Sequence, residues 1–319
     1  MHKAVRDHNE RMKWMLVQVL FLVLPLSLLH GQKDAQYTQY MYNTVTVNPA
    51  YAGSRGHLSI AALYRNQWLG LDGAPQTQTL NLHSPVGYRG MGLGLSIVND
   101  KLGPTSETDF GIDFSYTIPI SWNGKLSFGL KASAHMLDIR YSELDEFEID
   151  PQLQSQQDIR NKISPNVGAG AYYHTDRFYL GLSAPKILET THFDESSTTT
   201  AIERFNLYLI TGHVWDIDRQ WKFKPALLAK MVQGAPLQVD LSANFIWRER
   251  FIGGLAYRWD AAFSGLFGIM VSDQMMIGLA YDREITELGA ASFNDGSFEV
   301  ILRYDFIRSV GNLKSPRFF

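Results

Sequence analysis

The chain has 319 residues, a formal net charge of −3 and no cysteine. The missing cysteines exclude disulfides, thiolate metal sites and lipid attachment to an N-terminal cysteine, and the slightly negative charge disfavours a nucleic-acid-binding protein. Charged residues make up 19% of the chain, a smaller share than in most soluble domains.

The N-terminal segment from Met12 to Gly31, MKWMLVQVLFLVLPLSLLHG, is the one long apolar stretch of the sequence. Basic residues come before it and a small residue ends it, which is typical of a secretory signal peptide. The alternative is a transmembrane anchor, but such a helix needs about 20 unbroken apolar residues, and Pro25 interrupts this stretch. We therefore predict a signal peptide over residues 1–31, cleaved near Gly31, and a mature chain outside the cytoplasm.

Residues 32–56 form a segment rich in tyrosine that is too apolar and aromatic to stay free in water. Two interpretations fit: the segment plugs the interior of a barrel formed by the rest of the chain, or it docks a periplasmic partner. Exposed aromatic side chains often anchor protein interfaces. The predicted partner-binding residues are Tyr37, Tyr40, Tyr42, Asn48, Pro49 and Tyr51.

Residues 57–306 consist of alternating stretches separated by turn residues. In PLQVDLSANFIW, residues 236–247, Leu237, Leu241 and Phe245 share one parity, while Asp240 and Asn244 fall on the other. Because side chains alternate between the faces of a strand, such a segment has one apolar and one polar face. The region holds about fourteen such strands, each near the 9 to 11 residues that a tilted membrane strand needs.

The polar faces carry ionisable groups in mid-strand, and aromatic residues gather at the strand ends, as in the girdles of membrane barrels. The sequence therefore predicts an all-β protein, a transmembrane antiparallel outer-membrane β-barrel, followed by a tail over residues 307–319. The predicted lumen residues, which either form a hydrogen-bonded network or line a pore, are Lys125, Lys131, Asp240, Asp282, Glu299, Arg303 and Asp305. Small residues at Gly90, Gly92 and Gly94 are expected to leave space inside the barrel.

The connections are predicted from their turn residues. Asn-Gly in SWNGK (121–125) and Asp-Gly in NDGS (294–297) are typical of tight hairpins. Two longer polar stretches, residues 141–162 and 189–203, are expected to be loops on the exterior side. They serve either as ligand-binding loops or as mobile solvated ones.

No grouping of catalytic or metal-binding residues stands out. The nine histidines show no metal-ligand spacing, and neither His83 nor His135 has an evident serine partner for hydrolysis. The acidic run from Glu143 to Asp150 lacks the pattern of a calcium loop. We therefore predict a non-enzyme without cofactor or metal.

Several ordered blocks of the sequence are similar to those of one known family. The stretch AQYTQYMYNTVTVNPAYAGSRG contains Asn-Pro-Ala-Tyr-Ala-Gly at 48–53. The later blocks, in chain order, are YRNQWLGLDGAPQTQTLNLHSP, GLGLSIVNDKLGP, GLSAPKIL, APLQVDLSANF and GSFEVILRYDF. Together they resemble the PorP/SprF family of type IX secretion membrane proteins. The chain departs from the family in having Phe298 where a histidine is common, and Ser315 where a cysteine is common.

The resemblance implies an outer-membrane barrel that works with the type IX secretion or gliding motility machinery of Bacteroidota. It implies periplasmic ring lipoproteins and a peptidoglycan-binding protein as partners, and for some members a secreted adhesin whose C-terminal sorting domain is exported or anchored. The alternative function is an outer-membrane pore or a transporter of hydrophobic ligands. An adhesive or purely structural barrel comes third. Outer-membrane lipid is expected around the barrel, and nucleic acid is not expected as a partner.

Overall fold

The computed structural model describes residues 35–87, 90–144, 158–193, 199–203, 205–286 and 294–307. The predicted signal peptide and nearly all of the predicted tail lie outside these residues, as does most of the acidic run.

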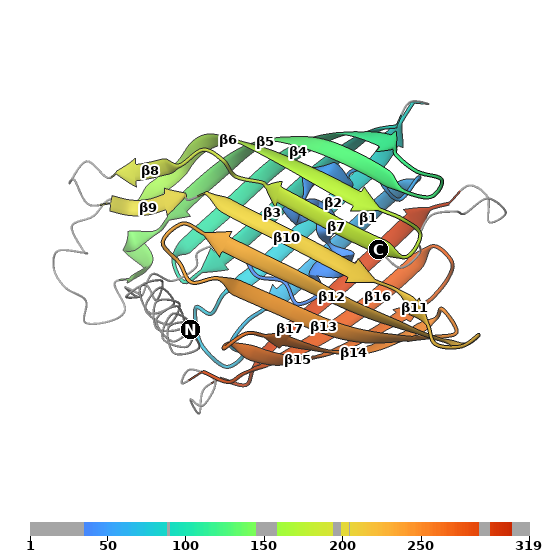
Figure 1. The fold of residues 1–319 in the computed structure, drawn as a ribbon. Coiled ribbons are helices and arrows are strands. Elements are labelled where there is room, and N and C mark those ends of the chain that lie inside the picture. The colour runs from blue at the N-terminus through green and yellow to red at the C-terminus, as the bar shows by residue number, and fades with distance from the viewer. Residues whose placement is uncertain are drawn as a thin grey trace, which may run out of the picture.

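The strands are long, and all pair antiparallel with their neighbours (Figure 1). The strands of the main sheet are β1 (Leu58–Asn66), β2 (Gln76–Val86), β3 (Met91–Leu102), β4 (Thr105–Pro119), β5 (Lys125–Ile139), β6 (Ile159–His174), β7 (Phe178–Ala184), β10 (Asn206–His213), β11 (Trp215–Asp216), β12 (Trp221–Val232), β13 (Gln238–Trp247), β14 (Phe251–Arg258), β15 (Ala262–Met270), β16 (Met275–Glu284) and β17 (Ser297–Phe306).

The sheet closes on itself. β1 pairs with β17, with Leu58 opposite Phe306, and β10 pairs with both β7 and β12. The two-residue strand β11 only extends the β12 ladder beyond the end of β10. The result is a closed antiparallel barrel of 14 strands, which confirms the predicted fold. Closure removes the exposed strand edges that would otherwise leave backbone groups unpaired in lipid.

The two faces of the wall follow the sequence alternation. In β13, Leu241 and Phe245 are each 45% exposed on the outside, whereas Asp240 is 5% exposed and Asn244 is fully buried inside. The outer face is apolar all around the barrel, with exposed side chains that include Leu80, Leu93, Phe110, Ile112, Phe114, Leu130, Leu180, Leu255, Phe267 and Leu302. Such a continuous apolar band is suited to lipid. This protein is an outer-membrane barrel, and β13 turns its apolar face to the membrane.

The two ends of the barrel differ in their connections. At one end the strands are joined by residues 87–90, 120–124, 175–177, 214–220, 248–250 and 271–274. The other end has the longest connections, 140–158, 185–205 and 285–296, together with short ones such as 103–104 and 259–261. In outer-membrane barrels the short turns face the periplasm, so we call the first the periplasmic end. Aromatic rings gather there, with the Trp221 and Trp247 rings tilted by 36° and their centroids 6.3 Å apart, as expected of an interfacial girdle.

Three predictions about connections differ from the structure. Asp295-Gly296 is no tight hairpin; it ends the long connection between β16 and β17, where Gly296 O accepts from Leu69 N at 2.8 Å. Residues 189–203 contain a second sheet, the hairpin of β8 (Thr190–Phe193) and β9 (Thr199–Glu203). The loop predicted over 141–162 starts with a short 3₁₀-helix, η3 (Tyr141–Leu144), and gives way to β6 at Ile159.

Among the described residues, no helix is long and apolar enough to cross a membrane. Short helices occur near the N-terminus: η1 (Tyr40–Tyr42), α2 (Thr44–Val47) and η2 (Pro49–Tyr51). They lie within the barrel, where Figure 1 shows them in blue behind the strands.

Candidate functional site in the barrel lumen

Residues 35–56, which we call the plug, fill the lumen. Tyr40 and Met41 are 1% exposed and Ala50 is fully buried. The plug forms a common hydrophobic core with inward-facing wall residues such as Tyr172 and Ile210. The barrel therefore has a packed interior where the plug crosses it.

The first residues of the plug are held by carboxylates near the exterior end. The Glu299 carboxylate accepts hydrogen bonds from two successive backbone amides, Thr38 N at 2.9 Å and Gln39 N at 2.8 Å. The Thr38 hydroxyl donates to Asp282 at 2.7 Å. Arg65 of β1 binds both carboxylates, with Asp282 at 2.6 Å and Glu299 at 3.2 Å. Because all these groups are buried, each charge is satisfied only through the others. We call Asp282 and Glu299 the upper anchor.

The middle of the plug touches the wall of β5, β6 and β7 without any charged group. Asn48 caps η2 by accepting from Ala50 N at 2.9 Å, and its amide donates to Ala171 O at 3.1 Å. Ser183 Oγ donates to Val47 O at 2.7 Å. At these points the backbone of the plug lies directly against the strands, so the wall residues that face it there must be small.

Glycines make this close approach possible. A Cβ added at Gly129 would overlap the backbone of Ala50, and one added at Gly170 or Gly181 would overlap the Asn48 side chain. On β3, a Cβ at Gly92 would overlap Ala52 O. The plug occupies the space that Gly92 and Gly94 were expected to leave; Gly90 lies instead in a turn at positive φ. We call Gly129, Gly170, Gly181 and Ser183 the seat.

The plug leaves the lumen at the periplasmic end through a third set of contacts. The Tyr51 ring packs edge-on against Tyr172 with centroids 5.3 Å apart. Arg55 donates to Asp305 from Nη2 at 2.9 Å and from Nε at 3.2 Å. Ser59 Oγ also donates to Asp305, at 2.7 Å. We call Asp305 the lower anchor.

The residues predicted to bind partners all lie in the plug. Tyr37, Tyr40 and Tyr51 are at most 7% exposed and Asn48 is fully buried. Pro49 is buried as well, and Tyr42 is half-buried. In this arrangement they contact the barrel wall. Their role toward a second protein stays a prediction. Tyr42 borders a large cavity.

The residues predicted to lie in the lumen form separate groups, most of them tied to the plug. The upper and lower anchors account for three of them. Asp240 accepts from Arg258 Nε at 2.6 Å, and Arg258 in turn donates to Gln36 of the plug. Lys131 pairs with Asp113 at 3.1 Å within the wall. Lys125 points inward by parity but lies exposed at the end of β5.

Sequence reasoning missed the partners in these groups, namely Arg55, Arg65, Asp113, Arg258, Thr38 and Gln39. Arg65, Asp113 and Arg258 share the inward parity of their strands, a signal that was available. The plug residues carry no such signal, because their contacts lie more than 200 positions away in the sequence.

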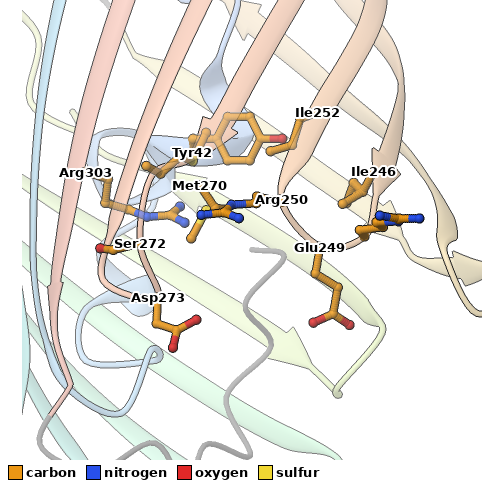
Figure 2. A pocket seen from close by; sticks show the side chains of 11 residues that line it. Tyr42, Ile246, Glu249, Arg250, Ile252, Met270, Ser272, Asp273 and Arg303 are labelled. Atoms are coloured by element: carbon orange, nitrogen blue, oxygen red, sulfur yellow. The ribbon is translucent and has the colours of Figure 1, made fainter.

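A cavity of about 460 Å³ lies below the plug, between it and the periplasmic turns. Its apolar wall includes Ile246, Ile252 and Met276, which form a small buried cluster. Arg303 of β17 and Arg250 of the 248–250 turn also line it (Figure 2).

The Tyr42 ring forms the roof of this cavity. Lys224 Nζ lies 4.7 Å from the ring centroid and the Arg303 guanidinium 5.9 Å from it. Burial raises the pKa of the Tyr42 phenol to about 12, so the ring stays neutral at ordinary pH and can receive the Arg303 guanidinium on its π-system.

One histidine of β5, His135, lies beside a carboxylate. His135 Nδ1 lies 3.0 Å from Asp109 Oδ1, and Ser164 faces His135 across the β5–β6 ladder. The Ser164 hydroxyl has no hydrogen-bond partner in the described part of the chain, so nucleophile and base are not coupled. Within the same residues no cluster of three His, Asp or Glu could hold a metal ion.

A family model described as type IX secretion system membrane protein PorP/SprF matches residues 29–304. A search of curated proteins gives no match.

Among solved structures, the chain is similar to the toluene transporter TbuX of Ralstonia pickettii, with 10% identity, a TM-score of 0.49, and coverage of 86% of this chain and 95% of the other. It is also similar to the outer membrane protein Omp33 of Acinetobacter baumannii, with 8% identity, a TM-score of 0.46, and coverage of 78% and 98%. A FadL homologue of Pseudomonas aeruginosa gives 13% identity, a TM-score of 0.45, and coverage of 87% and 96%.

Proposed function

Because the chain belongs to the PorP/SprF family of type IX secretion system membrane proteins, we propose that it is a non-catalytic anchor of the secretion and gliding machinery. In this role the barrel is fixed in the outer membrane and binds machinery components on its periplasmic side. The proposed partners are ring lipoproteins, a peptidoglycan-binding protein and, as a client, the C-terminal sorting domain of a secreted protein.

The observation that carries this proposal is the packed lumen. The plug is tied to the wall at its start, middle and end, by Glu299, Asn48 and Asp305 in turn. A barrel filled in this way is a rigid body, which suits an anchor better than a conduit. We also propose the corresponding division of the chain: a signal peptide over 1–31, the plug segment over 32–56, the barrel over 57–306 and a tail over 307–319.

The test is a pull-down of the tagged protein from detergent-solubilised outer membranes, with the captured proteins identified by mass spectrometry. Recovery of periplasmic lipoproteins, a peptidoglycan-binding protein or a secreted protein's C-terminal domain is expected. Recovery of the barrel alone after crosslinking would contradict the proposal.

Two matched tryptophan variants test at which end of the barrel the partners bind. Trp122 is fully exposed in the periplasmic turn 120–124, and Trp259 is 67% exposed in a turn at the exterior end. Exposed tryptophans are frequent energetic centres of protein interfaces. Trp122→Ala is expected to reduce capture of periplasmic partners, and Trp259→Ala to leave it unchanged. The reverse result would place the partners on the exterior side.

The alternative, a pore or a transporter of hydrophobic ligands, requires a path through the lumen. The buried contacts of Tyr40, Met41 and Ala50 with the wall argue against one. Single-channel recording in planar bilayers discriminates the two functions: the anchor is expected to show no steady conductance, and a pore would show one.

A further inference from the structure

The cavity below the plug is lined by three arginines, Arg248, Arg250 and Arg303, and by two carboxylates, Glu249 and Asp273. Arg303 is 3% exposed. Its Nε lies 3.5 Å from Asp305 Oδ2 and has no hydrogen-bond partner in the described part of the chain. Asp305 is already occupied by Arg55 and by Ser59, both at shorter distances. The Arg303 guanidinium therefore has donors to spare, and a buried donor without a partner is costly.

Arg250 adds a second guanidinium. It comes from the turn between β13 and β14, and no described carboxylate pairs with it. Its two neighbours in the turn have other partners: Glu249 pairs with Lys222 at 2.8 Å, and Arg248 stacks on Trp247 at 4.7 Å. Figure 2 shows the Arg250 and Arg303 side chains on the cavity wall, one from the turn before β14 and the other from β17, three strands away in the sheet. Two like charges lining the same cavity are unfavourable until an anion comes between them.

The rest of the cavity restricts the kind of anion. Ile246, Ile252 and Met276 form a buried apolar cluster, with Met270 packed against it. An inorganic anion would not contact this apolar surface. A carboxylate attached to an apolar chain would contact both the arginines and the apolar wall. The cavity volume of about 460 Å³ falls within the usual range of small-ligand pockets.

We propose that this cavity binds a carboxylate attached to an apolar chain, with Arg303 and Arg250 clamping the carboxylate and the isoleucine–methionine wall receiving the chain. A terminal carboxylate of a hydrophobic peptide and the head of a fatty acid share this chemistry. Guanidinium groups hold carboxylates through paired, charge-assisted hydrogen bonds. Tyr42 closes the site from above, so a ligand enters from the periplasmic end. The inference rests on the cavity alone and does not depend on the secretion role.

The test measures binding of three probes to the full chain in detergent micelles by isothermal titration calorimetry. The probes are N-acetyl-Leu-Phe with a free carboxylate, the same dipeptide as its C-terminal amide, and octanoate. The acid is expected to bind at least tenfold more tightly than the amide, because loss of the charge removes the clamp. If octanoate binds as well as the dipeptide acid, the site is supported with a fatty-acid-like ligand. Equal affinity for acid and amide would overturn it.

Two arginine variants and one matched control complete the experiment. Arg250→Gln changes an exposed turn residue and should leave the fold intact, while weakening binding of the acid about tenfold. Arg303→Gln should weaken it at least as much. Arg177→Gln is the control, because Arg177 lies in another periplasmic turn, exposed and paired with Asp216; no change in affinity is expected. Undiminished binding to Arg250→Gln, or no binding of either acid at about 10 mM, would overturn the proposal.

Ile307, the last described residue, lies beside the 271–274 turn that borders the cavity, since Gln274 Nε2 donates to Ile307 O at 3.3 Å. A chain that stops at Ile307 is therefore titrated as well. Unchanged or tighter binding of the acid would support the site, and tighter binding would show that the removed segment competes for it. Loss of acid binding by this shortened chain would contradict the proposal that Arg250 and Arg303 form the binding site.

Discussion

The seat on β5–β7 and the anchors on β16–β17 hold the same segment by opposite means. At the seat, Gly129 and Asn48 bring uncharged groups into close contact, and the fit depends on shape. At the anchors, Glu299 and Asp305 bind amides and a guanidinium, and the fit depends on charge. The cavity opens on the charged side. Beside the uncharged contact only a small cavity of about 90 Å³ remains, next to Val47, whereas the cavity of about 460 Å³ on the charged side has arginine donors that can serve a ligand.

The lower anchor should be the most sensitive point of this arrangement. Asp305→Asn would leave Arg55 and Arg303 buried without their carboxylate, and removing one partner of a buried pair costs about 3–5 kcal/mol. We expect a loss of that size in the free energy of unfolding. Urea unfolding in detergent micelles, followed by tryptophan fluorescence, measures it.

The matched control for the lower anchor is Asp216→Asn at the same end of the barrel. Asp216 pairs with Arg177 and with Lys222, but its side chain is 35% exposed and that of Arg177 is 62% exposed. Exposed pairs contribute about 0–1 kcal/mol. Equal losses for the two variants would show that the buried position of Asp305 is not what makes it an anchor.

The seat can be broken by adding volume. Gly129→Val places a side chain where the Ala50 backbone lies, and overpacking of this kind costs about 1–3 kcal/mol. The expected result is a less stable barrel with a displaced plug, seen as a lower urea midpoint and as new conductance in planar bilayers. Gly265→Val is the control, because nothing lies within 4 Å of a Cβ added there. If the seat depends on shape, Gly129→Val should lower the urea midpoint clearly more than Gly265→Val does.

A smaller effect is expected from the hydrogen bonds of the seat. Asn48→Ala removes both the cap on Ala50 N and the donor to Ala171 O, and loss of a capping side chain costs about 0.5–2 kcal/mol. Measured by the same unfolding assay, the variant should fall between the wild type and Gly129→Val. A loss larger than that of Asp305→Asn would reverse the ranking of seat and anchors.

The barrel itself was accessible from the sequence because strand alternation is local. Leu241 and Asp240 lie on opposite faces as their parity requires, and the same rule located the strands. Connections were less accessible. Asp295-Gly296 has the composition of a tight turn, but its hydrogen bonds go to Leu69 in another loop, and no local pattern reports a tertiary contact.

The site was only half accessible for the same reason. Parity placed Asp282, Glu299 and Asp305 in the lumen, but not beside Thr38, Gln39 and Arg55. The plug has no regular periodicity in its sequence, so the sequence does not show which plug residue lies beside which strand residue. The cavity was missed entirely, since it depends on the direction of two arginine side chains from strands and turns far apart in the sequence.

The smallest expected effect concerns whether the seat and the lower anchor stabilise the protein independently. Asn48 and Asp305 share no bonding partner, and changes at independent sites add within about 0.3–0.5 kcal/mol. The double variant Asn48→Ala, Asp305→Asn should therefore lose the sum of the two single losses in unfolding free energy. A double variant that loses clearly less would mean that breaking the anchor already frees the plug from its seat. The plug would then leave the lumen as one unit, and its contact with the seat would depend on its bond to the lower anchor.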